Sequence, residues 1–331
     1  MKVCMVIPQD TPPTGGNRIT ASRLAEALTA SGVTVGIGVG EPLSGDWDLY
    51  HAFNAAKVAL SLVAGGIEAE RVVVTWTGTD LWQDWERMPE RLRQGLDGVA
   101  GHVVFTPDAR ARLLAVAPEW RERIQIIPPG VDTQRHAPGP PAHAWRHPVA
   151  LLAGGIRPVK RSAWAIELVE AARRQGFGLE LIIAGPIRDL EEGLRVQRAA
   201  RGRPWVALLG EVPAEAMPGW YRSVDLVINT SAVEGVSNAL MEAMACGTPV
   251  LASDIAGNRS LIEPGVTGLL FSDGSSFVAQ VRALLEGIVD GRALGQRARA
   301  RIVERHSVRA EAASYLAWYR QSLEAVRGCR R

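Results

Sequence analysis

The sequence predicts an α/β protein made of two Rossmann-like domains, each built on a parallel sheet. Length is the first reason, because 331 residues exceed what one ordinary hydrophobic core accommodates. Residues 2–30 and 149–173 supply the second reason, since each runs from an apolar strand through a glycine-containing loop into a helix. That order opens a doubly wound sheet. The third reason is a proline-rich connector at residues 137–142, which lies between these two segments.

The composition restricts the compartment and the kinds of partner that we expect. A formal net charge of +2 is close to neutral and does not favour a nucleic acid or a membrane surface as partner. Cys4, Cys246 and Cys329 are far apart and lack metal-ligand spacing, which favours reduced thiols in a cytoplasmic protein. A strand begins at once without a signal peptide, and no apolar run is long enough to span a membrane.

The first half of the chain is predicted to alternate strands with helices. The expected strands are residues 2–8, 33–39, 46–52, 71–76, 102–106 and 124–127, and the expected helices are residues 19–30 and 107–117. Gly16, Asn17 and Arg18 lie in the loop after the first strand. A glycine there lets the backbone approach a ligand, so these residues are candidate contacts, although a purely structural turn fits them equally well.

Polar residues also follow the third and fourth strands. His51 and Asn54 lie at the end of the third strand, and Thr79 and Asp80 lie in the loop after the fourth. Loops at these ends line the ligand crevice of a doubly wound sheet, so the four residues are candidate ligand contacts. For His51, packing in the core is the alternative.

Two other features of this half have alternative interpretations. The tryptophans of the fourth strand and its loop either form a sugar-stacking wall or pack in the core: Trp76, Trp82 and Trp85. The D-x-D sequence at residues 46–48 has the form of a metal site, but it enters an apolar strand pattern and is interpreted as part of that strand. We therefore predict no metal site.

The second half repeats the strand and helix alternation. Strands are expected at residues 149–153, 179–184, 206–209 and 225–229, and helices at residues 162–173, 277–285, 293–304 and 310–323. The predicted domains are residues 1–140 and 149–305 with a linker at 141–148, followed by a C-terminal helical segment at 306–331. In two-domain folds of this kind the last helix commonly crosses back to the first domain.

The most informative stretch is EGVSNALMEAMACGTPV, residues 234–250. It follows a buried-strand pattern and reads as a short helix with Ser237 or Asn238 as N-cap and Gly247 at its end. The unpaired N–H groups at a helix N-terminus suit an anion. Glu234 and Glu242 flank this end and could accept hydrogen bonds from hydroxyl groups; an N-cap with a solvated glutamate is the alternative.

A second cluster follows the strand at 149–153. Gly155 precedes Arg157 and Lys160, and a helix is predicted to begin at Ser162. A planar guanidinium and a compact ammonium near a helix entrance suit a pyrophosphate, whereas basic residues at such a position more commonly mark a solvated surface.

The spacing of Glu234 and Glu242 resembles the E-x7-E signature of the retaining GT-B glycosyltransferases related to glycogen and sucrose synthases. Residues 252–257 and 263–268 resemble the same family, and the similarity covers most of residues 149–272. The resemblance implies two domains facing a cleft, with the acceptor on the N-terminal domain and a nucleotide sugar on the C-terminal one.

The resemblance also implies roles for particular residues. Arg157 and Lys160 would bind the donor diphosphate and, with Glu234 on the sugar hydroxyls, form the catalytic set; Glu242 would bind the ribose. The full donor-binding set implied in this way is Gly16, Gly155, Arg157, Lys160, Val212, Glu234, Val236, Ser237, Asn238 and Glu242. The residues implied on the acceptor or sugar side are Asn17, Arg18, His51, Asn54, Thr79 and Asp80. No cofactor is expected, since the nucleotide sugar, a UDP-sugar first of all, is a substrate.

Residues 16–21 and 77–80 are similar to two narrower groups, the glycosyltransferase-one-domain-containing proteins and the bacterial selenosugar synthases. Many family members carry a donor-contacting histidine where this chain has Gly-Thr-Asp at 78–80. The expected function is metal-independent, retaining sugar transfer to a small acceptor. The alternatives are a selenosugar or thiosugar synthase using UDP-N-acetylglucosamine and a chalcogen phosphate, and a non-catalytic nucleotide-sugar-binding protein. The acceptor, the sugar and the oligomeric state are left open.

Overall fold

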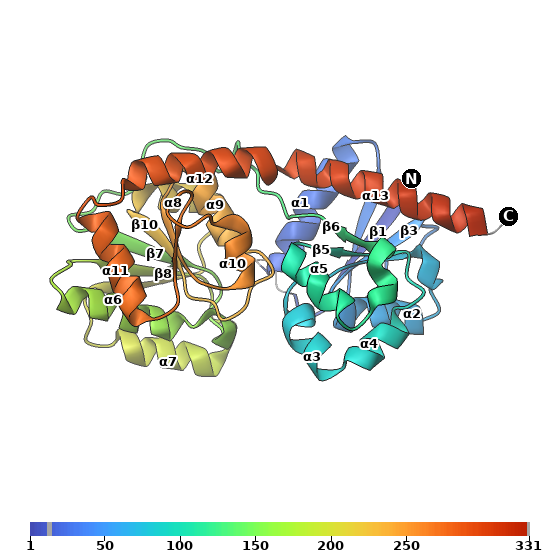
Figure 1. Ribbon diagram of the computed structural model, residues 1–331, viewed down its shortest axis with the longest axis horizontal. Helices are drawn as coiled ribbons and strands as arrows, with labels where there is room; N and C mark the ends of the chain where they lie inside the picture. Colours follow the sequence, from blue (N-terminus) through green and yellow to red (C-terminus); the bar gives the residue numbers. More distant parts are fainter. Residues whose placement is uncertain (12–14, 330–331) are drawn as a thin grey trace. The chain divides into compact units, whose positions relative to one another are not determined.

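The computed structural model describes residues 1–11 and 15–329, with side chains as far as residue 324. These residues form two compact units, which are Met1–Gly130 with residues 307–329 (unit 1) and Val131–His306 (unit 2). In the part of the chain described, each unit contains a six-stranded sheet whose paired strands all run parallel (Figure 1). The two sheets have the Rossmann-like α/β architecture that the sequence predicts.

Unit 1 has the strand order β2-β1-β3-β4-β5-β6. Its strands are β1 (Lys2–Ile7), β2 (Thr34–Val39), β3 (Leu49–Phe53), β4 (Val72–Thr75), β5 (Gly101–Val104) and β6 (Ile124–Ile126). Its helices are α1 (Gly16–Ala30), α2 (Leu60–Ala64), α3 (Trp85–Arg87), α4 (Pro89–Gly95), α5 (Pro107–Leu114) and α13 (Val308–Cys329). Shorter helical turns are η1 (Ala55–Ala59), η2 (Ala69–Arg71), η3 (Asp80–Asp84) and η4 (Pro118–Arg123).

The last helix of the chain, α13, completes the core of unit 1. Tyr315 and Tyr319 of this helix are fully buried in the same hydrophobic cluster as Leu24 of α1. Arg23 of α1 donates to the buried carboxylate of Glu311, with 3.2 Å between Nη2 and Oε2. Residues more than 280 positions apart in the sequence are therefore neighbours in this core.

Unit 2 has the strand order β12-β11-β10-β7-β8-β9. Its strands are β7 (Val149–Ala153), β8 (Glu180–Ala184), β9 (Val206–Gly210), β10 (Leu226–Asn229), β11 (Val250–Ser253) and β12 (Leu269–Phe271). Its helices are α6 (Ser162–Arg174), α7 (Leu190–Ala200), α8 (Met217–Ser223), α9 (Asn238–Cys246), α10 (Ala256–Leu261), α11 (Gly274–Leu285) and α12 (Gly291–Arg305), with a 3-10 turn η5 (Pro158–Lys160).

The pairing of β7 with β10 positions the candidate site. Val227 of β10 is opposite Leu151 of β7, and because the strands are parallel their carboxyl ends lie side by side. Alternate residues of β7 enter two different hydrophobic clusters, so this central strand is covered on both faces. The loops that leave β7 and β10, residues 154–161 and 230–237, are consequently neighbours.

Residues 131–148 pack within unit 2. The Val131 N–H donates to the carbonyl of His306 at 2.8 Å, where the chain leaves this unit again. Farther along, Ser223 Oγ accepts from the N–H groups of Ala142 and His143 at 2.8 and 2.9 Å. These bonds fix the proline-rich segment to α8.

Some elements differ from the sequence prediction. The third strand begins at Leu49 rather than at Asp46, and just before it the side chain of Asp48 accepts a hydrogen bond from the N–H of Lys2 at 2.7 Å. The first helix begins at Gly16, three residues earlier than predicted. The helices α2, α3, α4, α7, α8 and α10 were not predicted.

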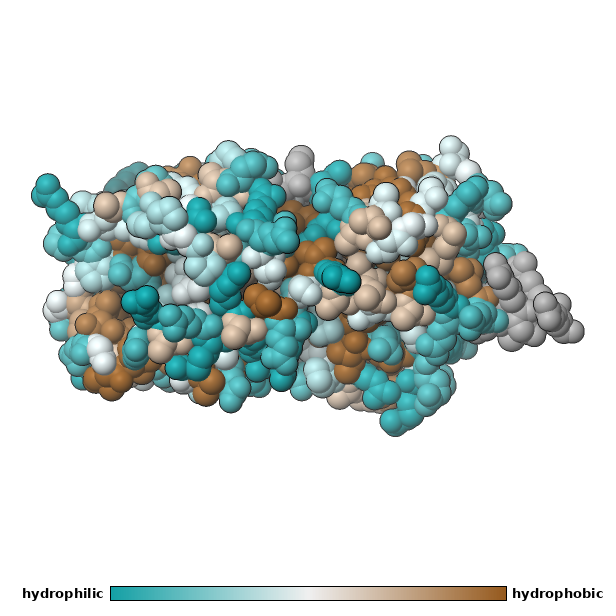
Figure 2. Space-filling view, turned by 90° about the horizontal axis from the view of Figure 1, so that it is seen from above, coloured by the Kyte–Doolittle hydropathy of each residue, from teal (hydrophilic) through white to brown (hydrophobic). Residues whose placement is uncertain are grey.

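The surfaces of both units mix hydrophilic side chains with small hydrophobic patches in the face that Figure 2 shows, as is common for proteins in water. Within the residues described, none of the helices combines the length and the apolar character needed to cross a bilayer.

Candidate functional site

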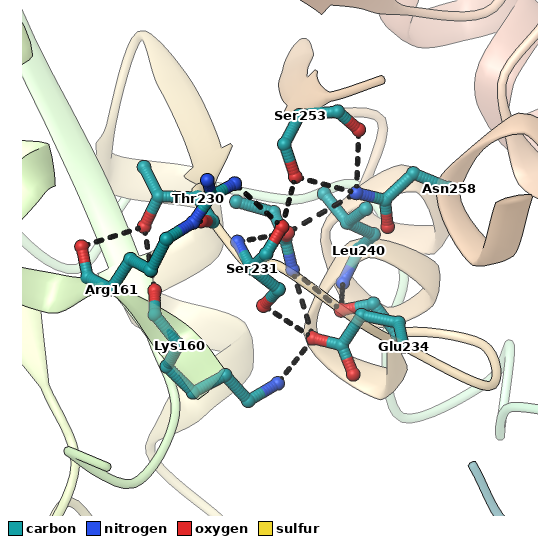
Figure 3. Close-up of polar contacts among 10 residues, drawn as sticks. Lys160, Arg161, Thr230, Ser231, Glu234, Leu240, Ser253 and Asn258 are labelled. Carbon is teal, nitrogen blue, oxygen red and sulfur yellow. Dashed lines mark hydrogen bonds and ion pairs between the residues drawn. The ribbon is translucent and has the colours of Figure 1, made fainter. Parts of the chain in front are cut away.

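Glu234 lies in the loop between β10 and α9, at the centre of a polar network (Figure 3). Its Oε1 atom accepts from Ser231 Oγ at 2.7 Å and from Asn229 Nδ2 at 3.3 Å, and it forms an ion pair with Lys160 Nζ. The carboxylate is 10% exposed. In the described part of the chain these bonds all end on Oε1, which leaves Oε2 available to a ligand hydroxyl.

The charge of Glu234 is stabilised by these neighbours. Burial works against the ionised carboxylate, but the ammonium of Lys160 and the hydrogen bonds from Ser231 and Asn229 outweigh it and lower the pKa of Glu234 below its usual value. The group is therefore a carboxylate at neutral pH, and it acts as a hydrogen-bond acceptor rather than as an acid.

A layer of buried amide and hydroxyl groups holds this loop from behind. Asn258 of α10 donates to Asn229 Oδ1 at 3.2 Å and to the carbonyl of Ser253 at 2.9 Å. Ser253 Oγ in turn donates to the carbonyl of Ser231 at 2.7 Å. Because Asn229 and Ser231 are the residues that bind Glu234, this layer determines where the carboxylate lies.

The helix that follows is capped as the sequence predicts. Ser237 is the N-cap of α9, and its Oγ accepts from the N–H of Leu240 at 3.4 Å and from Asn229 Nδ2 at 3.2 Å. Asn238 is the first residue of the helix, and Gly247 ends it with a φ of 80°, a conformation that favours glycine. Val236 is partly buried beside the cap. The N-terminus of α9 is thus held next to Glu234 by Asn229.

Lys160 reaches Glu234 because the loops after β7 and β10 are fastened together. Arg161 Nε donates to the carbonyl of Thr230 at 2.6 Å, and its Nη2 donates to the carbonyl of Ser231 at 2.9 Å. In the reverse direction, Thr230 Oγ1 donates to the carbonyl of Lys160 at 2.8 Å. Arg161 has a φ of 49°, in the left-handed region where non-glycine residues are uncommon, and its guanidinium lies 4.3 Å from the ring centroid of Trp164.

The structure also locates three other residues of the predicted donor-binding set. Arg157 is exposed at the start of η5, one turn before Lys160. Gly155 lies against Arg188, since a Cβ atom at this position would be 2.8 Å from Arg188 Cγ. Val212 is partly buried in the segment after β9.

Glu242 lies about one turn into α9 and has its own partners. The Tyr221 hydroxyl donates to Glu242 Oε2 at 2.8 Å, and His136 Nε2 is 4.0 Å from the same oxygen. Burial raises the pKa of Tyr221, and the adjacent carboxylate raises it further, so the phenol keeps its proton and donates. The carboxylate is 21% exposed, which leaves it accessible to a ligand.

In unit 1 the structure places His51 and Asn54 inside the protein. His51 is fully buried, with Nε2 2.7 Å from Thr75 Oγ1 and Nδ1 2.6 Å from the hydroxyl of Tyr319. Burial lowers the pKa of His51 to about 3, so the ring is neutral. Asn54 is buried and caps η1, accepting from the N–H of Lys57 at 2.8 Å. These contacts agree with the alternative interpretation of His51, in which its side chain packs in the core.

Asp80 organises the loop after β4. It is fully buried and accepts from the N–H groups of Ala55, Thr77 and Gly78 at 2.8 to 2.9 Å. Burial raises the pKa of Asp80 to about 6, against the opposing effect of these N–H groups. Thr79, the next candidate, is partly exposed beside it. Asp80 therefore shapes the backbone of this loop rather than presenting a free carboxylate.

The candidates in the first loop lie at the beginning of α1. Gly16 is exposed as the first residue of this helix, and Asn17 and Arg18 are partly buried. The Nε atom of Arg18 is buried without a hydrogen-bond partner among the described residues.

Several residues of the network in unit 2 were missed from the sequence: Asn229, Ser231, Tyr221, His136, Asn258 and Arg161. Asn229 and Ser231 lie within five residues of Glu234 at the end of a strand, which is a usable signal. The other residues become visible only when the fold brings distant segments together. In the described residues, no group of three or more histidine, cysteine, aspartate or glutamate side chains is arranged to hold a metal ion.

Comparison with solved structures identifies the fold as GT-B, the two-domain fold of many glycosyltransferases. Sucrose-phosphate synthase from Thermosynechococcus elongatus matches with a TM-score of 0.78 and 20% identity, over 98% of this chain and 100% of that one. Anabaena HepE in complex with UDP and glucose matches with a TM-score of 0.72 and 18% identity, over 99% and 100% of the two chains.

Comparison of sequences finds similarity to group 1 glycosyltransferases over part of the chain. Residues 147–287 match the family described as Glycosyl transferases group 1. D-inositol 3-phosphate glycosyltransferase from Geodermatophilus obscurus is 30% identical over 181 residues, which are 49% of this chain and 40% of the relative. The match thus spans less than half the length of that relative. Glycosyltransferase 1 domain-containing protein 1 from Xenopus tropicalis is 26% identical over 82% of this chain and 84% of its own length.

Proposed function

We propose that the protein transfers a sugar from a nucleotide sugar, with a UDP-sugar as the first candidate, to a small acceptor. The observation that carries the proposal is the Lys160–Glu234 pair, held in one place by Arg161 and Asn229 beside the N-terminus of α9. A cation and a carboxylate side by side suit a ligand that offers both a diphosphate and hydroxyl groups. The HepE complex contains ligands of this kind, since UDP carries a diphosphate and glucose carries hydroxyl groups.

Each residue of the pair takes one part of the donor. Lys160 and the exposed Arg157 bind the diphosphate and stabilise the charge that develops on it, together with N–H groups near Val236 to Asn238. The Oε2 atom of Glu234 accepts a hydrogen bond from a sugar hydroxyl, while Oε1 remains bound to its protein partners. Glu242 accepts hydrogen bonds from the ribose hydroxyls, while its Oε2 atom also accepts from the Tyr221 hydroxyl.

In the proposed reaction, the bond between the anomeric carbon and the phosphate oxygen breaks, and its electron pair leaves with the diphosphate. An acceptor oxygen forms its bond to the same face of that carbon, so the configuration is retained. The proton of the acceptor passes to the departing diphosphate. No metal ion is required in this scheme, because Arg157 and Lys160 supply the positive charge.

A thermal-shift panel tests the donor site. Unfolding is followed with UDP, GDP and ADP and with their glucose conjugates; a ligand at one hundred times its Kd stabilises the fold by about 2.7 kcal/mol. We expect a shift with UDP and UDP-glucose that is lost in Arg157→Ala and Lys160→Ala. Arg174→Ala is the matched control, because this exposed arginine lies at the opposite end of α6. No shift with any nucleotide, or equal loss in the control, would contradict the proposal.

A further inference from the structure

Unit 1 contains a pocket of about 440 Å³ to which none of the proposed donor-binding residues contributes. We call it the indole pocket. It lies among η3, α3, α4 and α5, and its lining includes the side chains of Trp82, Trp85, Glu86, Asp108 and Arg112. Its size is within the range of small-molecule sites, which are mostly apolar with a few placed polar groups.

The apolar part of the pocket is rigid. Trp85 is 3% exposed and packs edge-on against Trp76, with ring centroids 5.3 Å apart and planes at 85°. It also lies 5.8 Å from the ring of Trp120. Trp82 is only partly buried, so its indole presents apolar surface at the pocket. Such rings are large, rigid surfaces for an apolar face of a ligand.

The charged residues of the pocket are arranged by Arg112. Its guanidinium lies 4.8 Å from the ring centroid of Trp82, and its Nε donates to the carbonyl of Leu81 at 3.2 Å. It also forms an ion pair with Glu86. Asp108 is exposed in the first turn of α5. With Glu86, Asp108 and Arg112 ionised, the pocket has one excess negative charge, which disfavours an anionic ligand such as a nucleotide.

We propose that the indole pocket binds a neutral hexose unit. Its apolar C–H face packs on the indole of Trp82, and its hydroxyl groups donate to the carboxylates of Asp108 and Glu86. A hexose offers an apolar face, several donors and no negative charge, and each of these properties matches one part of the pocket. The inference uses residues of unit 1 only and does not depend on the donor chemistry of unit 2.

Ligand-observed NMR tests this inference on the full chain without any nucleotide. The probes are the methyl glycosides of glucose, galactose, mannose and N-acetylglucosamine, and saturation transfer from protein to ligand is measured. We expect transfer to the ring C–H protons of at least one glycoside, lost in Trp82→Ala. In Asp108→Asn the Kd should rise about tenfold, because a hydrogen bond to a charged carboxylate is replaced by a weaker one to a neutral amide oxygen.

Two controls make the outcome decisive. Trp145→Ala removes a tryptophan that is 38% exposed in unit 2, and it should leave the transfer unchanged. Trp82→Phe keeps an aromatic ring and should retain a weaker signal even if Trp82→Ala folds poorly. Absence of transfer from every glycoside, or an equal signal in wild type, Trp82→Ala and Asp108→Asn, would overturn the inference. Nucleotide thermal shifts measured on the same variants report on unit 2 separately.

Discussion

Arg161 allows a quantitative test of how unit 2 holds its two site loops together. Its guanidinium donates to the carbonyls of Thr230 and Ser231, while its backbone has a φ of 49°. Two effects therefore oppose one another at one residue. The side chain stabilises the loop pair, and the left-handed backbone of a non-glycine residue costs about 1–2 kcal/mol.

Replacing Arg161 with alanine and with glycine separates these effects. A hydrogen bond from a charged donor contributes about 1.5–3 kcal/mol, but the carbonyl of Ser231 keeps a second donor, Ser253 Oγ. We therefore expect Arg161→Ala to lower the free energy of unfolding by about 3 kcal/mol. Arg161→Gly loses the same bonds but relieves the backbone strain, so its loss should be smaller by about 1 kcal/mol.

Calorimetry and denaturant unfolding measure both losses. For a domain of 150–250 residues, 1 kcal/mol shifts Tm by about 2–4 °C, so alanine should lower Tm by about 6–12 °C and glycine by about 4–8 °C. Arg174→Ala again serves as the control, with a shift near zero. A loss below about 1 kcal/mol in Arg161→Ala, or a glycine variant less stable than the alanine variant, would refute this account of the loop pair.

Three further predictions follow from the pKa values and contacts. Folding lowers the pKa of Glu234, so the ionised carboxylate contributes to stability above pH 4.5. This contribution is lost as the pH falls through the pKa of the folded state. The unfolding free energies of wild type and Glu234→Gln should therefore converge at acidic pH. Burial lowers the pKa values of His51 and His102 to about 3. Between pH 6.5 and pH 3 the unfolded chain therefore binds more protons than the folded one. Each histidine should lower the free energy of unfolding by about 1.4 kcal/mol for every pH unit of acidification in this range. Tyr221→Phe removes the donor to Glu242 and should weaken nucleotide binding severalfold, with about 1 kcal/mol lost in stability.

Each of these predictions has a contradicting result. Parallel pH curves for wild type and Glu234→Gln would mean that the Lys160 pairing does not favour the carboxylate in the folded state. An unchanged acid slope in His102→Gln would mean that this ring already carries a proton when folded. Equal nucleotide affinity in Tyr221→Phe, measured by titration calorimetry, would separate Glu242 from the binding site.

The fold was predictable from the sequence because its signals are local. Apolar runs such as Val149–Ala153 are strands in the structure, and the N-cap at Ser237 and the end at Gly247 follow from residue type and spacing. Glu234 and Lys160 were each identified from their own segments. Their contact was not predictable, because the two residues are 74 positions apart in the sequence and meet only through the pairing of β7 with β10.

The contacts that lie deeper required the structure for physical reasons. Asp80 looks like a crevice residue in the sequence, but burial and its bonds to backbone N–H groups make it a turn-forming residue. Arg161 adopts a left-handed backbone that its residue type disfavours, so no propensity indicates it. Asn258 acts through Asn229 from a helix that was not predicted. Each of these features is a tertiary interaction that overrides the local preference.

The position of α13 has a consequence for biosynthesis. Unit 1 begins with the first strand of the chain, yet its core is completed by Tyr315 and Tyr319, which a ribosome adds only after all of unit 2. Unit 2 is continuous in sequence, so it can fold as soon as residues 131–306 have emerged. Until then the partner surface of α13 on unit 1, which includes Leu24, is left without its cover. Residues 1–130 thus precede unit 2 in synthesis but reach their final structure only after α13 has been made, and unit 1 is where a chaperone would find apolar surface on the nascent chain.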